Sequence, residues 1–168
     1  SAELTQVGYV VLVTREPGGT QISQQIREIL LNPNCREMAW ETELLLFAAA
    51  RSQHVAEVIA PALEAGKIVI SDRFSDSTVA YQGYGRGLDL DMIRHLNQIA
   101  TKGLSPDLTF VLDLPVEIGL QRARQNRGSL DRLELERLEF HRRVRGGYLA
   151  IASQEPHRVK VIDAQADV

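Results

Sequence analysis

The chain has 168 residues, of which 44% are hydrophobic, so it can bury one core and we expect a single domain. Its formal net charge of −3 argues against a nucleic-acid coat or a binder of anionic membranes, and no apolar run reaches the roughly 20 residues that a bilayer crossing needs. The single cysteine, Cys35, cannot form an internal disulfide, which favours a reducing, cytoplasmic setting.

The order of apolar patterns along the chain predicts an α/β fold. Residues 1–8 have the pattern of a helix end that stops at Gly8. The predicted strands are 9–13, 67–71, 108–114 and 158–163, and the predicted helices are 20–31, 41–65, 89–101, 117–126 and 131–153. This alternation predicts a parallel, doubly wound sheet with right-handed crossovers. The strands are almost continuously apolar, which predicts burial on both faces.

Polar residues follow the first two predicted strands, at the end of the sheet where such folds bind their ligands. The segment 14–20 (TREPGGT) follows the first strand, and the segment 72–82 (DRFSDSTVAYQ) follows the second. Charged side chains at two neighbouring strand ends are costly unless they are paired or bind something. We therefore expect the functional site at these two segments.

In the second of these segments, the spacing predicts side chains gathered near Arg73. Arg73 follows directly after a strand, so its stem can pack while its guanidinium faces the cleft. Ser77 and Tyr81 are four residues apart, as are Thr78 and Gln82, so each pair shares a helix face. Hydroxyl and amide groups beside an arginine suit a phosphate and a polar ring. The alternative is a structural acid–arginine pair followed by an ordinary helix.

A second candidate pair lies in the long helix predicted at 41–65. Phe47 and Arg51 are four residues apart with three alanines between them, which leaves room for a flat ligand that stacks on the ring. A core phenylalanine beside a surface arginine is the alternative. Arg27, in an earlier predicted helix, can point either to the cleft or to water. The four histidines, His54, His95, His141 and His157, are scattered, and we interpret them as structural or exposed.

Arginine makes up 16 of the 19 basic residues, and eight arginines lie between Arg122 and Arg145. The guanidinium fork suits phosphate when geometry matters. The segment 121–136 is polar, rich in arginine and broken by Gly128, as expected of a mobile lid over a phosphoryl-transfer centre. An exposed helix corner with salt bridges to nearby glutamates is the alternative.

Five motifs together resemble the thymidylate kinases, in the bacterial form with arginines in the lid. They occur in the family's order and are TREPGGT (14–20), LLFAAAR (45–51), DRFSDSTVAYQGYGRG (72–87), SPDLTFVLDLPVEIGLQRAR (105–124) and LDRLELERLEFHRRVRGGYL (130–149). The resemblance implies a three-layer P-loop NTPase-like fold with five strands. It also implies transfer of the ATP γ-phosphoryl group to dTMP with Mg²⁺, giving dTDP for dTTP synthesis, in a homodimer packed through helices.

The resemblance also implies roles for individual residues. Thymine is expected to stack on Phe47 and to receive hydrogen bonds from Arg51 and Gln82. The other implied dTMP-binding residues are Ser77, Thr78 and Tyr81 around the base and Arg27 and Arg73 at the monophosphate. The implied catalytic residues are Glu16, Arg73, Arg127 and Arg132. Arg122, Arg124 and Arg127 are expected to contact ATP from the lid, Asp72 to approach Mg²⁺ through water, and adenine to lie between the lid and the segment after Asp163.

One departure from the family concerns the phosphate-binding loop, which has the form G-x-x-x-x-G-K-[ST]. The only Gly-Lys pair is Gly66-Lys67, and Ile68 follows it. The family's first strand, which lies in the middle of the sheet, is absent together with the loop. We therefore expect a chain truncated at its N-terminus and before a final C-terminal helix, and inactive by itself. A catalytically silent nucleotide-binding remnant and a kinase of this fold for another monophosphate are the alternatives.

Overall fold

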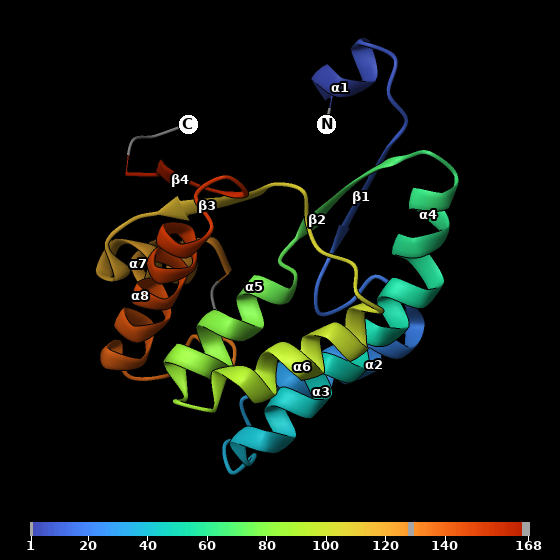
Figure 1. Cartoon of the computed structure of the whole chain (residues 1–168). Helices are drawn as coiled ribbons and strands as arrows, with labels where there is room; N and C mark the ends of the chain where they lie inside the picture. The colour runs from blue at the N-terminus through green and yellow to red at the C-terminus, as the bar shows by residue number, and fades with distance from the viewer. Residues whose placement is uncertain (1, 128–129, 166–168) are drawn as a thin grey trace.

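The computed structural model of the chain describes residues 2–127 and 130–165, with only the backbone of residues 126 and 127. Helices and strands alternate, as predicted (Figure 1). Two helical runs contain π-helical segments. In chain order the elements are α1 (Ala2–Gln6), β1 (Val11–Arg15), α2 (Gln21–Leu31), α3 (Trp40–His54), η1 (Val55–Ile59), α4 (Ala60–Glu64), β2 (Ile68–Asp72), α5 (Ser75–Thr78), η2 (Val79–Gly85), α6 (Leu90–Thr101), β3 (Thr109–Asp113), α7 (Val116–Arg127), α8 (Leu138–Gln154) and β4 (Val159–Asp163).

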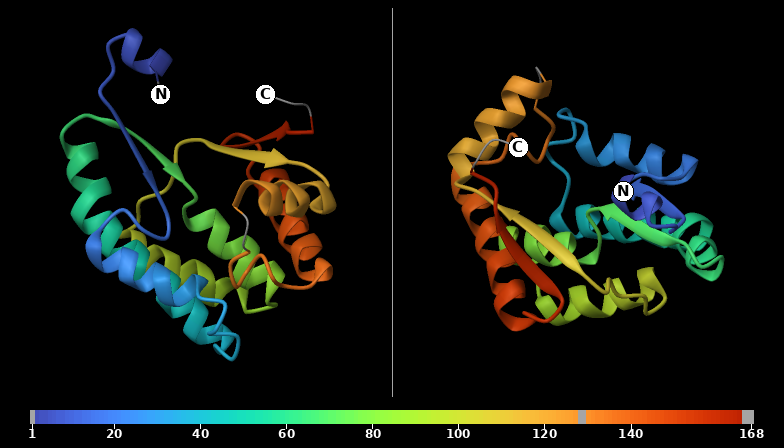
Figure 2. Two further views of the ribbon diagram at one scale, coloured as in Figure 1. Left: turned by 180° about the vertical axis from the view of Figure 1, so that it is seen from behind. Right: turned by 90° about the horizontal axis from the view of Figure 1, so that it is seen from above.

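The four strands form two parallel pairs rather than one continuous sheet. In the first pair, Arg15 at the end of β1 lies opposite Asp72 at the end of β2. In the second, Asp113 of β3 lies opposite Asp163 of β4. Among the described residues, β2 and β3 pair with no further strand, and Figure 2 shows the two pairs apart. The parallel α/β class is confirmed, and the single sheet that was predicted is divided between β2 and β3.

The prediction that the strands are buried on both faces is wrong for this structure. Val159 is the only described strand residue that is fully buried. Val13 is 61% exposed, Phe110 58% and Leu112 65%. Helix α8 packs against β3 and β4. A two-stranded pair has few neighbours, so the outward side chains have nothing to pack against.

The apolar core lies instead between helical segments. Its buried residues come from η2, α8, β4 and the segment before α8, and they are Ala80, Leu133, Phe140, Val144, Ile151, Ala152 and Val159. Helix α8 approaches η2 closely because both carry glycines at the contact. A Cβ at Gly147 would lie 2.8 Å from Tyr84, and one at Gly85 would lie 2.8 Å from Phe140 and Val144.

Two helix predictions differ from the structure. The predicted helix 131–153 begins only at Leu138, because the backbone before it forms a turn around Asp131. The Oδ1 atom of Asp131 accepts hydrogen bonds from the amides of Leu133 and Glu134, at 2.9 Å each. The predicted helix 41–65 forms as the continuous run α3–η1–α4. None of the described helices combines the length and apolar composition that a bilayer crossing requires.

Candidate active site

The structure brings together the two strand ends at which the sequence places the site. The register of the first pair sets Arg15 beside Asp72, and the amide of Glu16 donates to the Asp72 carbonyl at 2.9 Å. The side chain of Asp72 is exposed, whereas that of Glu16 is buried. The turn of TREPGGT therefore packs directly against the start of DRFSDS.

Arg51 is the centre of a buried polar network rather than a surface residue. It is 2% exposed, and its Nε donates to Glu16 Oε2 at 2.7 Å. Its Nη1 donates to Thr78 Oγ1 at 2.8 Å and to Asn97 Oδ1 at 2.9 Å, and its Nη2 donates to the Phe74 carbonyl at 3.1 Å. A guanidinium has five N–H donors. Four are used within the described part of the chain, which leaves one on Nη2.

His54, which sequence reasoning left without a role, holds the other side of Glu16. Its ring is fully buried, with Nδ1 3.1 Å from Glu16 Oε1 and Nε2 2.7 Å from Thr14 Oγ1. Gly19 packs against the same ring at a φ of +87°, and a Cβ there would lie 2.4 Å from His54. The second glycine of TREPGGT is thus required both by its backbone angle and by the histidine beside it.

Two rows of side chains face each other across the site. Each row has residues four positions apart: Glu43, Phe47 and Arg51 on α3, and Thr78 in α5, Gln82 in η2 and Arg86 directly after η2. At one end, Gln82 Nε2 donates to Glu43 Oε1 at 2.8 Å, and at the other Arg51 contacts Thr78. The rows therefore run antiparallel, with the half-buried Phe47 in the middle. A flat ring stacked on Phe47 would lie between the Gln82 amide and the Arg51 guanidinium.

Glu43 is a buried acid with two arginines, Arg86 and Arg132, beside its carboxylate. Arg86 Nη2 lies 2.9 Å and Arg132 Nη2 2.7 Å from Glu43 Oε2. Burial raises the pKa of Glu43, but the hydrogen bonds from Arg86 and Gln82 and the charges of Arg86 and Arg132 outweigh it, so the pKa lies below its ordinary value. Arg132 is buried and also donates from Nε to the Leu30 carbonyl at 2.8 Å. It ties the end of the expected lid to α3, and its catalytic role stays a prediction.

Arg73 projects from a strained backbone position at the end of β2. Its φ of 70° lies in the left-handed region, which costs a non-glycine residue about 1–2 kcal/mol and often marks a functional site. Its guanidinium lies 5.0 Å from the centre of the Tyr81 ring, and Nη1 donates to Tyr148 Oη at 3.3 Å. Tyr148 in turn donates to Ser77 Oγ at 2.8 Å. Burial raises the pKa of Tyr148 to about 12, so the phenol remains a donor.

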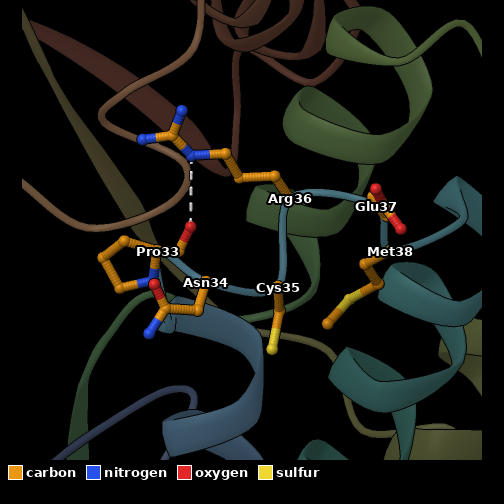
Figure 3. Close-up of a pocket in the computed structure, with 6 residues that line it drawn as sticks. All are labelled: Pro33, Asn34, Cys35, Arg36, Glu37 and Met38. Atoms are coloured by element: carbon orange, nitrogen blue, oxygen red, sulfur yellow. Dashed lines mark hydrogen bonds between the residues drawn. The ribbon is translucent and has the colours of Figure 1, made fainter.

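Arg27 approaches the TREPGGT turn from α2. Its Nη1 donates to the Pro17 carbonyl at 2.8 Å. With Arg15 it lines a hollow of about 410 Å³ that the segment 130–134 closes from the other side. A larger hollow, of about 600 Å³, is formed by residues 33–38 of the loop between α2 and α3 (Figure 3). That loop contains none of the predicted site residues.

The predicted ATP-binding arginines differ in what the structure shows of them. Arg122 donates to the carbonyls of Ala164 and Gln165, at 2.9 and 3.1 Å, in the segment after β4. Arg124 is exposed on α7, and the side chain of Arg127 lies outside the described residues. Arg122 therefore contacts the segment after Asp163, beside which adenine was expected, and the ATP-binding role of these arginines stays a prediction.

The predicted metal contact has little support from neighbouring acids. Among the described residues, no three His, Cys, Asp or Glu side chains form a group that could hold a metal ion. Glu16 is engaged at both carboxylate oxygens, by Arg51 and His54. Of the two acids Glu16 and Asp72 at this strand end, only Asp72 has an exposed side chain. One free carboxylate fits Mg²⁺, which usually keeps several waters and binds through one or two carboxylates together with phosphates.

Comparisons with known proteins agree with these motifs. A family model described as "Thymidylate kinase" matches residues 1–168. The chain is 57% identical over 162 residues to a thymidylate kinase of Synechococcus sp. (strain JA-2-3B'a(2-13)), covering 96% of this chain and 76% of the relative. It is 54% identical over 170 residues to one of Geotalea uraniireducens (strain Rf4), covering 98% and 80%. A crystal structure of thymidylate kinase from Ehrlichia chaffeensis matches with a TM-score of 0.78 at 37% identity, covering 96% of this chain and 79% of that one.

Proposed function

The chain belongs to the thymidylate kinase family, and we propose that the facing rows on α3 and α5–η2 form its slot for the thymine of dTMP. The reaction is transfer of the γ-phosphoryl group of ATP to dTMP, which gives dTDP. The P-loop NTPase-like α/β fold expected from the sequence is confirmed by the solved relative. Neither the silent remnant nor a kinase for another monophosphate is favoured by any of these comparisons.

The observation that carries the proposed slot is the position of Phe47 between two polar ends. The ring supplies a stacking surface, and the Gln82 amide supplies an acceptor. The donor is the Nη2 hydrogen of Arg51 that has no partner in the described part of the chain. Thr78 holds Arg51 in place by accepting from Nη1 at 2.8 Å. Stacking of a base on an aromatic side chain contributes about 1–3 kcal/mol.

The monophosphate is assigned to the two arginines that flank the TREPGGT turn. Arg73 is exposed and oriented by Tyr81 and Tyr148, and Arg27 reaches the Pro17 carbonyl from α2. Ser77 is connected to Arg73 through Tyr148, whose hydroxyl accepts from Arg73 Nη1 and donates to Ser77 Oγ. Two guanidinium groups offset the charge of the acceptor phosphate and fix its orientation.

We assign stabilisation of the γ-phosphoryl group during its transfer to Arg73, to Glu16 and to the lid. Glu16 acts through the buried network that it organises. Arg132 could reach the phosphates only by leaving its ion pair with Glu43, so Arg122, Arg124 and Arg127 are the lid residues assigned to ATP. Mg²⁺, held through water by Asp72, would neutralise charge on the phosphates when bound. The 168 residues contain no G-x-x-x-x-G-K-[ST] loop, so they do not supply the contacts that such a loop makes to the phosphates of ATP.

A homodimer packed through helices is also part of the proposal. Apolar side chains are exposed on two helices that both pack against α3, with Ile22 and Ile29 on α2 and Met92 and Ile99 on α6, and Ile99 is 74% exposed. Such side chains are common at interfaces between copies of one chain. Sedimentation equilibrium tests this, since Ile99→Glu should shift a dimer toward the monomer.

The free cysteine, Cys35, fits a reaction in the cytoplasm.

The decisive experiment compares turnover with binding in the same preparation. The full gene product, with any residues that precede Ser1 or follow Val168, is assayed for dTDP formation from dTMP and ATP, with and without Mg²⁺. Metal-dependent dTDP formation supports the enzyme. Tight dTMP binding without dTDP formation would identify a silent remnant, and failure to bind dTMP would contradict the assigned slot.

A further inference from the structure

The contact between Glu43 and Gln82 determines which atom of the Gln82 amide faces the ring slot. We propose that Glu43 is a specificity-determining positioning residue, which fixes Gln82 so that the slot accepts a pyrimidine with a protonated N3, such as thymine, and rejects cytosine. This inference rests on the proposed function, because it takes the slot beside Phe47 to be the base site.

The chemistry of the two side chains permits only one orientation of the amide. A carboxylate accepts hydrogen bonds and cannot donate them, whereas the primary amide donates from Nε2 and accepts at Oε1. Gln82 Nε2 therefore has to face Glu43, as it does at 2.8 Å. Both side chains are buried, so water does not take the place of either partner. Within the described part of the chain Oε1 makes no hydrogen bond, and it is not among the buried polar atoms that lack a partner, so a ligand can reach it.

The carboxylate is held so that it cannot rotate away from Gln82. Arg86 donates from Nε to Glu43 Oε1 at 3.2 Å and from Nη2 to Oε2 at 2.9 Å. Arg86 is itself fixed, since its Nη1 lies 2.7 Å from Glu136 Oε1 and its guanidinium lies 4.5 Å from the Phe140 ring centre. The lowered pKa of Glu43 keeps it ionised near neutral pH, and hence an acceptor.

The resulting order of acceptor and donor matches the edge of thymine. Gln82 Oε1 accepts, and the remaining Nη2 hydrogen of Arg51 donates. Thymine presents an N3–H donor next to the O4 acceptor, whereas cytosine presents an N3 acceptor next to an N4 amino donor. Cytosine would therefore place its N3 acceptor against the Gln82 acceptor and its N4 donor against the Arg51 donor, so neither hydrogen bond forms. If Glu43 did not hold the amide, Gln82 could turn over and offer Nε2 to the N3 atom of cytosine.

The test is the ratio of dissociation constants for dCMP and dTMP, measured by calorimetry on the full gene product. Glu43→Gln allows either amide orientation, and it should lower the dCMP/dTMP ratio about tenfold, within the range that one base contact contributes. Gln82→Leu should also lower the ratio. In the Gln82→Leu background, Glu43→Gln should have no further effect, because Glu43 acts through Gln82.

A matched control lies on the same helix. Glu41→Gln makes the same chemical change two positions away on α3, where the side chain is exposed and no contact joins it to Gln82 among the described residues, so the ratio should stay within twofold. If Glu43→Gln does not fold, Glu43→Asp keeps the charge for the arginines but shortens the reach to Gln82, and it should lower the ratio similarly.

The possible results separate this inference from the function on which it rests. A folded Glu43 variant with an unchanged ratio, beside a Gln82→Leu variant with a lowered one, would overturn the role of Glu43 and leave the base site intact. Unchanged dTMP and dCMP binding in Gln82→Leu would instead mean that the slot beside Phe47 is not the base site. A further drop in the double variant would show that Glu43 acts other than through Gln82, and would also overturn the proposal.

Discussion

Replacement of Arg51 by methionine tests the buried network at the centre of the site. The change removes the partner of Glu16 Oε2 at 2.7 Å and the donors to Thr78 and Asn97, while it keeps much of the apolar stem. Glu16 is then left buried, with His54 as its remaining side-chain contact. Removal of one partner from a buried ion pair costs about 3–5 kcal/mol. For a domain of this length, the unfolding midpoint should fall by about 6–20 °C.

The assay is urea unfolding of the full gene product, followed by circular dichroism, with thermal unfolding beside it. Arg94→Met is the matched control, because Arg94 is exposed and pairs with the exposed Asp91 on the surface of α6, and it should cost less than about 1 kcal/mol. Glu16→Gln in the Arg51→Met background should restore part of the loss, since the unpaired acid is removed. A loss below about 1 kcal/mol for Arg51→Met would refute the view that this network stabilises the site.

Three further predictions concern single residues. Phe47→Ala should weaken dTMP binding by about 1–3 kcal/mol with a smaller effect on kcat, which steady-state kinetics measure, and an unchanged KM would mean that no base stacks there. Arg73→Ala should lower kcat/KM for dTMP by on the order of 3 kcal/mol, and unchanged kinetics would remove it from the phosphate site. Burial lowers the pKa of His141 from 6.5, so the unfolded chain binds the proton more readily and stability should fall as pH drops below about 6.5. His141→Asn should lose that part of the pH dependence in unfolding titrations, and an identical pH profile would contradict it.

Short-range spacing predicted much of the site. The interval of four residues between Phe47 and Arg51, and between Thr78 and Gln82, sets each pair on one helix face. The hydrogen bonds from Arg51 to Thr78 and from Gln82 to Glu43 join the two helical segments that carry these pairs. The strand ends at Glu16 and Asp72 meet because parallel neighbours end at the same edge of a sheet. These features follow from local periodicity, which one sequence contains.

Contacts between distant segments could not be predicted in this way. Tyr148 reaches Ser77 across 71 positions, and nothing in the local pattern of α8 distinguishes it from a core tyrosine. Glu43 belongs to the same row as Phe47, so the spacing could have drawn attention to it, but its burial depends on Arg86 and Arg132. The apolar strands were expected to be buried, and their exposure depends on how many strands lie beside them.

The central claim is that this chain belongs to an enzyme that phosphorylates dTMP through the slot beside Phe47. The most direct test incubates the full gene product with ATP labelled at the γ-phosphate, Mg²⁺ and an equal mixture of dTMP, dCMP, dAMP and dGMP, and then separates the labelled diphosphates. The account predicts that dTDP carries nearly all the label transferred to deoxynucleotides. Label spread evenly over the four products, or found mainly in another one, would contradict it.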